Sequence, residues 1–178
     1  FGYGYSGSPN VVSMTNLVSS VGVVATDTTG VGTARYYLSA CEYGTDKGIF
    51  GFGGNPSTAI TNLVSNAGVV STDVTGVGTV RGGLASNLSM TNLVSNTGVV
   101  ATDTTGVGTA RQDLAACEYG EDKGIFGFGN DGSETAVTNL VSNAGVVATD
   151  VTGVGTARDM IAACSYGGDK GIFGYGDA

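Results

Sequence analysis

The chain has 178 residues, 41% of them hydrophobic, so it is long and apolar enough to bury a core. It contains no histidine and no tryptophan, which excludes histidine-dependent catalytic triads and metal sites built on imidazole. Its 15 acidic and 7 basic residues give a net charge of −8, which disfavours nucleic acid as a partner. No apolar run approaches the length of a transmembrane helix, and we expect neither membrane insertion nor a cofactor.

Internal repeats dominate the sequence. The string Thr-Asn-Leu-Val-Ser begins at Thr15, Thr61, Thr91 and Thr138, at spacings of 46, 30 and 47 residues. Residues 91–111 and 138–158 are identical at 19 of 21 positions. We therefore predict a single repeat domain over residues 1–178. Its repeats are 1–34 (repeat 1, completed by 158–178), 35–80 (repeat 2), 81–110 (repeat 3) and 111–157 (repeat 4).

A complete repeat is predicted to hold four short antiparallel strands. In repeat 4, runs at 114–119 and 124–129 flank Gly-Glu-Asp-Lys, whose glycine and aspartate favour a β-turn. A second hairpin is expected from Thr-Asn-Leu-Val-Ser and the run at 145–150. Glycine, at 32 of the 178 positions, interrupts every window long enough for a helix, so the predicted fold is all-β. The predicted core contains Leu38, Ile49, Phe50, Leu63, Val69, Val70 and their equivalents.

Repeat 3 is truncated. After Arg81, nine residues lead directly to Thr91, so the segment equivalent to Cys-Glu-Tyr-Gly-Glu-Asp-Lys-Gly-Ile-Phe-Gly-Phe-Gly is missing. The two ends of the chain also complement each other, because residues 158–175 supply a first and a second strand without a third and a fourth. We predict that residues 158–176 pair with residues 11–34 and close a ring, with joining of neighbouring chains as the alternative.

Four short strands in about 46 residues are typical of a β-propeller blade. Arg-x-x-Leu-Ala, a Gly-Asp-Lys-Gly turn and Ile-Phe-Gly-Phe-Gly-Gly at 49–54 resemble the kelch repeat, whose apolar core strand ends in a glycine doublet. The resemblance implies a kelch-type β-propeller of about four four-stranded blades, one of them truncated. The repeats are also similar to tandem arrays in uncharacterised phage, viral and marine microbial proteins, which implies a virion or extracellular location.

An aspartate stands eight residues before each repeat arginine. We predict that the two form structural ion pairs or close a turn, and the alternative is a ring of charges that binds ions. The predicted pairs are Asp27 with Arg35, Asp73 with Arg81, Asp103 with Arg111, and Asp150 with Arg158.

Three cysteines, Cys41, Cys117 and Cys164, each follow a repeat arginine by six residues. We predict that they are small, buried, reduced core residues, because equivalent positions of separate blades lie too far apart for a disulfide. Asp46, Asp122 and Asp169 recur next to a lysine, and one carboxylate each falls short of the oxygen ligands that Ca²⁺ takes. Turn formation is therefore the expected role of these aspartates, and no metal site is predicted.

The segments between the second and third strands vary in length and sequence while the flanking strands barely change. Such loops often carry recognition, although drift in tolerant loops explains the same variation. The candidate ligand-binding residues there are Tyr5, Asn10, Asn55, Ser57, Asn130 and Asp131.

These observations predict a non-enzymatic structural or adhesive module of a larger assembly, with protein partners that include further copies of the chain. The alternative is a carbohydrate-binding, lectin-type propeller that uses the variable loops, since tyrosines can stack on the rings of a glycan. A kelch-type copper oxidase is disfavoured, because such copper sites rely on imidazole ligands.

Overall fold

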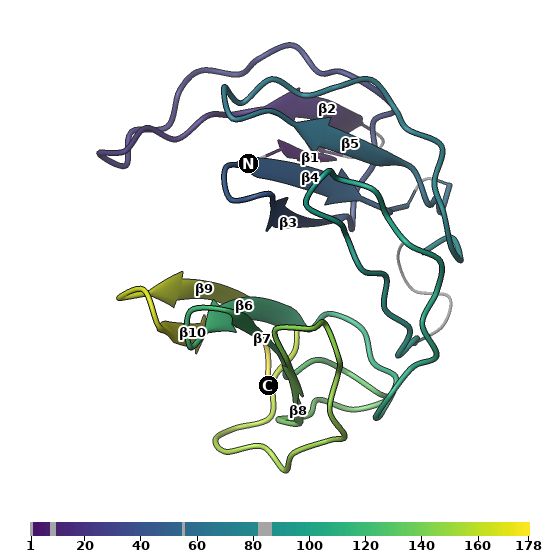
Figure 1. The fold of residues 1–178 in the computed structure, drawn as a ribbon, viewed down its shortest axis with the longest axis vertical. Coiled ribbons are helices and arrows are strands. Elements are labelled where there is room, and N and C mark those ends of the chain that lie inside the picture. The colour runs from purple at the N-terminus through teal and green to yellow at the C-terminus, as the bar shows by residue number, and fades with distance from the viewer. Residues whose placement is uncertain (1, 8–9, 55, 82–86) are drawn as a thin grey trace. The chain divides into compact units, whose positions relative to one another are not determined.

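The computed structural model describes residues 2–7, 10–54, 56–81 and 87–178. Within them the chain forms ten short β-strands and no helix (Figure 1), which confirms the all-β prediction, and accordingly no described helix could cross a membrane. The strands are β1 (Gly2–Tyr5), β2 (Val11–Thr15), β3 (Ser39–Tyr43), β4 (Lys47–Gly51), β5 (Thr61–Val64), β6 (Ala115–Tyr119), β7 (Lys123–Gly127), β8 (Thr138–Val141), β9 (Ala162–Tyr166) and β10 (Lys170–Gly174).

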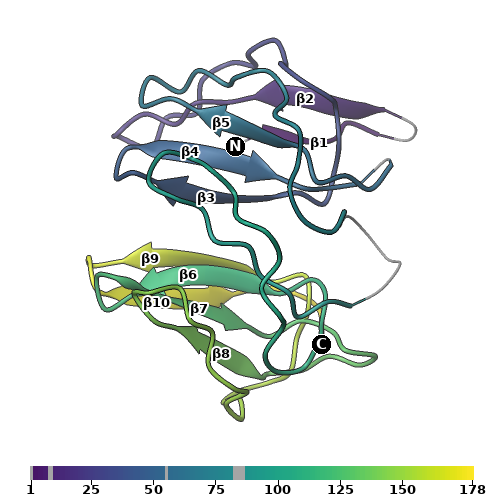
Figure 2. The same cartoon turned by 45° about the vertical axis from the view of Figure 1, so that its right-hand side comes forward.

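The strands form four small antiparallel sheets (Figure 2). The orders are β1-β2, β3-β4-β5, β6-β7-β8 and β10-β9. Contacts divide the chain into two compact parts: the first comprises residues 1–85 and 92–103, and the second comprises residues 86–91 and 104–178. Strands β1 to β5 thus belong to the first part, and β6 to β10 belong to the second.

The first predicted hairpin of each complete repeat is confirmed. In repeat 4, β6 pairs with β7 from Ala115 opposite Gly127 to Tyr119 opposite Lys123. The connecting turn starts with two residues at positive φ, Gly120 at 59° and Glu121 at 71°. Glycine adopts this conformation without strain, which explains why the repeat places a glycine directly after the tyrosine.

The second hairpin is less regular than predicted. The run at 145–150 forms no continuous strand, and its region meets β8 at two isolated bridges, Val141 with Val147 and Thr138 with Val151. Between these bridges the side-chain amide of Asn139 donates to the carbonyl of Ala148 at 3.2 Å. The side chain of Asn139 therefore bonds a carbonyl that would pair with a backbone amide in a regular β-ladder.

The predicted core is partly wrong. Ile49 is only 4% exposed, and Leu38, Phe50, Leu63 and Val70 are half-buried. Val69, by contrast, is 66% exposed because it directly follows a tight turn, where its amide donates to the Ser65 hydroxyl at 3.1 Å. Its equivalents in the other repeats are also exposed: Val23, Val99 and Val146. Among the described residues, the largest fully buried side chains are instead Arg35 and Asn62.

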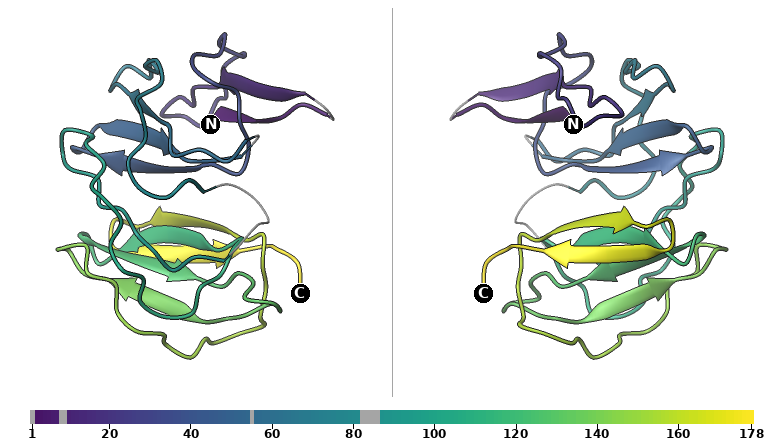
Figure 3. Two further views of the ribbon diagram at one scale, coloured as in Figure 1. Left: turned by 90° about the vertical axis from the view of Figure 1, so that its right-hand side faces the viewer. Right: turned by 90° about the vertical axis from the view of Figure 1, so that its left-hand side faces the viewer.

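In the second part, one hairpin stacks on the next. Strands β9 and β10, drawn in yellow, lie against β6 (Figure 3). The amide of Glu118 donates to the Ser165 hydroxyl at 3.2 Å, and the amide of Gly120 donates to the carbonyl of Asp169 at 2.7 Å. In the first part, β2 pairs with β1, and the predicted pairing of residues 158–176 with residues 11–34 stays a prediction.

Candidate functional site

Four polar side chains meet in the same way in three repeats. Each set contains a threonine two residues before the repeat arginine, the arginine itself, the asparagine of Thr-Asn-Leu-Val and an aspartate 11 residues after that asparagine. We call each set a polar node: node 2 is Thr33, Arg35, Asn62 and Asp73; node 3 is Thr79, Arg81, Asn92 and Asp103; node 4 is Thr109, Arg111, Asn139 and Asp150.

The arginine is the centre of each node. Arg35 is 1% exposed and its guanidinium donates three hydrogen bonds: to the Phe52 carbonyl at 2.7 Å, to the Thr33 carbonyl at 3.1 Å and to Asn62 Oδ1 at 2.6 Å. Asn62, 0% exposed, then donates to Asp73 Oδ1 at 2.9 Å. A buried guanidinium is tolerated only when its donors have such partners. Arg35 therefore joins the segment that follows β4, strand β5 and the segment that precedes the arginine.

The aspartate closes the node. Asp150 accepts from the amide and the hydroxyl of Thr109 at 3.0 and 2.7 Å and from Asn139 at 2.8 Å, while Arg111 Nη1 lies 3.8 Å away. The hydrogen bonds from Thr109 and Asn139 hold the pKa of Asp150 below its ordinary value of 3.8. This carboxylate is therefore ionised at neutral pH, and both of its oxygens accept hydrogen bonds from node residues. Its role is thus structural, and it is not available as a general base.

Node 3 forms although its repeat lacks the first hairpin. The hydroxyl of Thr79 donates to Asp103 at 2.7 Å, Asn92 donates to Asp103 at 2.9 Å, and Arg81 donates to Asn92. The node therefore does not need the missing segment, which elsewhere contributes a carbonyl such as that of Phe52.

The predicted Asp–Arg pairing is corrected. Asp150 lies beside Arg111 and not beside Arg158, which follows it by eight residues and donates to the carbonyl of Tyr175. Likewise Asp73 belongs with Arg35 through Asn62, and Asp27 accepts from Asn16. The aspartate pairs with the arginine that begins its own repeat, because the third and fourth segments fold back over that arginine.

A sequence signal for the nodes exists in the constant spacing of asparagine and aspartate. The glycine before each node threonine is a second signal. Gly108 has φ of 79°, and a Cβ at this position would collide with the carboxylate of Asp150 and approach Asn139 to 2.8 Å. Only glycine lets the backbone come this close to the carboxylate.

Successive repeats are joined by an aromatic ring at positive φ, which we call the aromatic clasp. Tyr3, Phe52 and Phe128 have φ of 63°, 61° and 62°, and the arginine of the following repeat stacks on each ring. The distances from the guanidinium carbon to the ring centre are 4.6 Å for Arg35 on Tyr3, 3.9 Å for Arg81 on Phe52 and 4.8 Å for Arg158 on Phe128.

The next glycine contributes to every clasp, and a phenylalanine packs on the ring in two of them, those of Tyr3 and Phe128. Gly129 donates its amide to the Arg158 carbonyl at 2.9 Å, and Gly4 and Gly53 make the same bond to the following arginine. Phe173 packs on Phe128 with ring centres 5.3 Å apart, as Phe50 does on Tyr3. Each clasp therefore joins one repeat to the next by stacking and backbone contacts.

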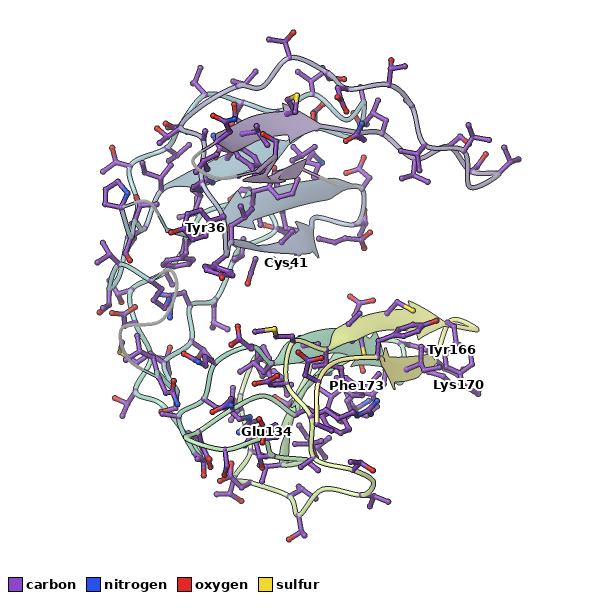
Figure 4. The ribbon with its side chains drawn as sticks, turned by 180° about the vertical axis from the view of Figure 1, so that it is seen from behind. Tyr36, Cys41, Glu134, Tyr166, Lys170 and Phe173 are labelled. Atoms are coloured by element: carbon purple, nitrogen blue, oxygen red, sulfur yellow. The ribbon has the colours of Figure 1, made fainter. Side chains whose placement is uncertain are left out.

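The cysteine prediction is corrected for burial. All three are free thiols, but Cys41, labelled on β3 in Figure 4, and Cys164 are exposed, and Cys117 is half-buried. Only Cys117 is covered by a following hairpin, whose Gly171 packs against its sulfur. Repeat 3 has no hairpin to cover Cys41. Burial raises the pKa of the Cys117 thiol, and the neighbouring Cys164 raises it further.

The recurring Asp-Lys turns are local structures. Asp46 accepts from Lys47 at 2.6 Å and from Asn66 at 3.2 Å, and Asp122 is held in the same way by Lys123 and Asn143. Within the described ranges, no three acidic or cysteine side chains gather as metal ligands would.

The candidate loop residues are distributed over both parts of the molecule. Asn10 and Ser57 are exposed and belong to the first part, whereas Asn55 and the side chain of Tyr5 lie outside the described structure. In the second part, the side chain of Asn130 donates to Asp159 at 2.9 Å and accepts from the backbone amide of Gly132 at 2.9 Å. Both ends of this side chain are therefore bonded within the protein.

Asp131 is exposed. Burial lowers the pKa of Arg111, and the negative charges of Asp150 and Asp131 partly offset this effect. Comparison with known proteins adds no assignment to these residues, since no family model matches the chain and no curated protein matches it.

Proposed function

We propose that the chain is a non-enzymatic structural or adhesive module, a kelch-like array of β-propeller blades in a larger assembly on a virion or cell exterior. The single observation that carries this proposal is the polar node. It recurs in three repeats with the same donors and acceptors, and it is kept where a hairpin has been lost. The side chains that the repeats share therefore serve to hold the chain together, as expected of a scaffold.

The blade arrangement is supported by the sheets themselves. In repeats 2 and 4, a three-stranded antiparallel meander is extended by a bridged fourth segment, which is the order of strands in a blade. Stacking of β9 and β10 on β6 in the second part supports face-to-face packing of consecutive blades.

Localisation tests the proposal directly. Antibodies raised against the chain should label the outside of intact virions or cells, and gentle disruption should release the chain within a larger complex. Labelling that appears only after the particles or cells are opened would contradict an exterior role.

Carbohydrate binding is the second candidate function, and the exposure of several tyrosines favours it. Tyr37, Tyr166 and Tyr175 are 60%, 53% and 89% exposed, and such rings can stack on pyranose faces. A glycan array separates the candidates. Repeated binding of one sugar class, lost in Tyr166→Ala or Tyr175→Ala, would favour a lectin, and an array without binding would favour the purely structural role.

A further inference from the structure

Repeat 3 leaves one side of a strand-like segment open. In repeats 2 and 4, Thr-Asn-Leu-Val pairs on one side with the second strand and on the other with the fourth segment. Among the described residues of repeat 3, residues 91–94 bridge to the fourth segment alone, Thr91 with Thr104 and Val94 with Val100. No strand of the described chain pairs with the other side.

The hydrogen bonds of repeat 2 show which backbone groups face that side. The carbonyls of Thr61 and Leu63 accept from the fourth segment, from Val74 at 2.9 Å and from Ser71 at 2.8 Å. Because backbone groups of alternate residues point to opposite edges of a strand, those of Asn62 and Val64 face β4.

The same alternation holds in repeat 3. The carbonyls of Thr91 and Leu93 accept from the fourth segment at 2.9 Å each. The backbone groups of Asn92 and Val94 therefore point to the open side. Open edges of this kind are templates for pairing with another strand.

The strand that fits this edge is defined by the other repeats. Lys-Gly-Ile-Phe-Gly pairs with Thr-Asn-Leu-Val in one register in both β4–β5 and β7–β8, with glycine opposite valine and phenylalanine opposite asparagine. The same five residues form β10, on which Figure 4 labels Lys170 and Phe173. Among the described residues, β10 pairs with β9 alone, and the edge that β4 and β7 use for Thr-Asn-Leu-Val has no partner there.

We propose that β10 of one copy of the chain pairs with residues 91–94 of a second copy, with Gly171 opposite Val94 and Phe173 opposite Asn92. The pairing adds a strand in the register already present twice in each chain, and it is independent of the function proposed above. Because donor and acceptor lie on different surfaces, the contact is heterologous and produces chains of copies or closed rings.

Sedimentation of the full chain over a range of concentrations tests this pairing. Val94→Pro removes the amide that faces the open edge and no hydrogen bond that the repeat itself uses, so the variant should keep its circular dichroism spectrum. The matched control, Val94→Ala, keeps the amide. The parent and Val94→Ala should rise beyond about twice the monomer mass with concentration, and Val94→Pro should remain a monomer.

Hydrogen exchange followed by mass spectrometry provides the second measurement and applies even if Val94→Pro does not fold. In the parent, peptides covering residues 91–96 and 170–175 should become more protected as the protein concentration rises. A parent that stays monomeric, a folded Val94→Pro that associates like the parent, or protection that does not change with concentration would each overturn the proposal.

Discussion

Phe128 and Tyr175 have the same backbone conformation, with φ of 62° and 64°, yet Phe128 is 7% exposed and Tyr175 is 89% exposed. Both are strained for residues with a Cβ. The difference arises from later segments of the chain, because Arg158 and Phe173 pack on Phe128. At Phe128 the backbone strain is therefore offset by packing of two side chains from the following segment, and at Tyr175 no such packing is present among the described residues.

Removing the clasp ring should reveal that difference. We expect Phe128→Ala to lower the free energy of unfolding by about 3 kcal/mol, as for a buried phenylalanine. Tyr175→Ala, at the equivalent position, should change it by no more than about 0.5 kcal/mol. Urea denaturation of both variants measures the two values, and equal losses would contradict the clasp.

Removing the buried node asparagine should lower the free energy of unfolding more than removing an exposed asparagine. Asn139→Ala removes the acceptor of Arg111 and a donor to Asp150, leaving a buried guanidinium with one partner fewer. We expect a loss of about 2–4 kcal/mol by urea denaturation. The control is Asn66→Ala, because Asn66 is exposed and bonds only an exposed turn; it should cost about 0.5 kcal/mol or less.

The stacking of β10 on β6 should not tolerate a side chain at Gly171. A Cβ there would collide with the sulfur of Cys117, whereas at the equivalent Gly48 the nearest atom lies 3.6 Å away. Gly171→Ala should destabilise the protein by about 1–3 kcal/mol through overpacking, and Gly48→Ala should be neutral or slightly stabilising. Thermal unfolding of the two variants tests this, and similar melting temperatures would count against the stacking.

Two equivalent cysteines should differ in reactivity. Cys164 is exposed, while Cys117 is covered by β10 and its thiol pKa is raised by burial. At neutral pH, Cys164 should therefore react faster with a disulfide reagent than Cys117. Peptide mapping after a short exposure measures the ratio, and both residues should react at similar rates once the protein is unfolded in urea. Faster labelling of Cys117 in the native protein would be inconsistent with its position.

Acid should weaken the nodes. Hydrogen bonds lower the folded-state pKa of Asp103 and Asp150 below 3.8, so each contributes stability above the unfolded pKa that is lost as pH falls through the folded pKa. Asp150→Asn should accordingly be less stable than the parent at pH 7, and the difference should narrow as the pH falls below the unfolded pKa. Glu134→Gln, a change at an exposed carboxylate outside the nodes, is the control. A difference that persists unchanged at acid pH would show that the charge of Asp150 is not what matters.

Local features were predictable from the sequence, and contacts across a repeat were not. The hairpin around residues 120–122 follows from a glycine and an aspartate placed between two short strand-forming runs, and these signals act within a few residues. The partner of Arg111 depends on how a distant segment folds back, and the spacing of eight residues pointed to the wrong aspartate. Recurrence of an apolar residue in every complete repeat predicts a core position for Val69, but the turn before it directs its side chain to solvent.

Node 3 shows that a node forms in a repeat that has no first hairpin. Its hydrogen bonds join residues on both sides of the position at which repeats 2 and 4 contain this hairpin: Thr79 and Arg81 before it, Asn92 and Asp103 after it. A repeat can therefore gain or lose this hairpin while the node side chains, and the spacing of asparagine and aspartate, stay the same.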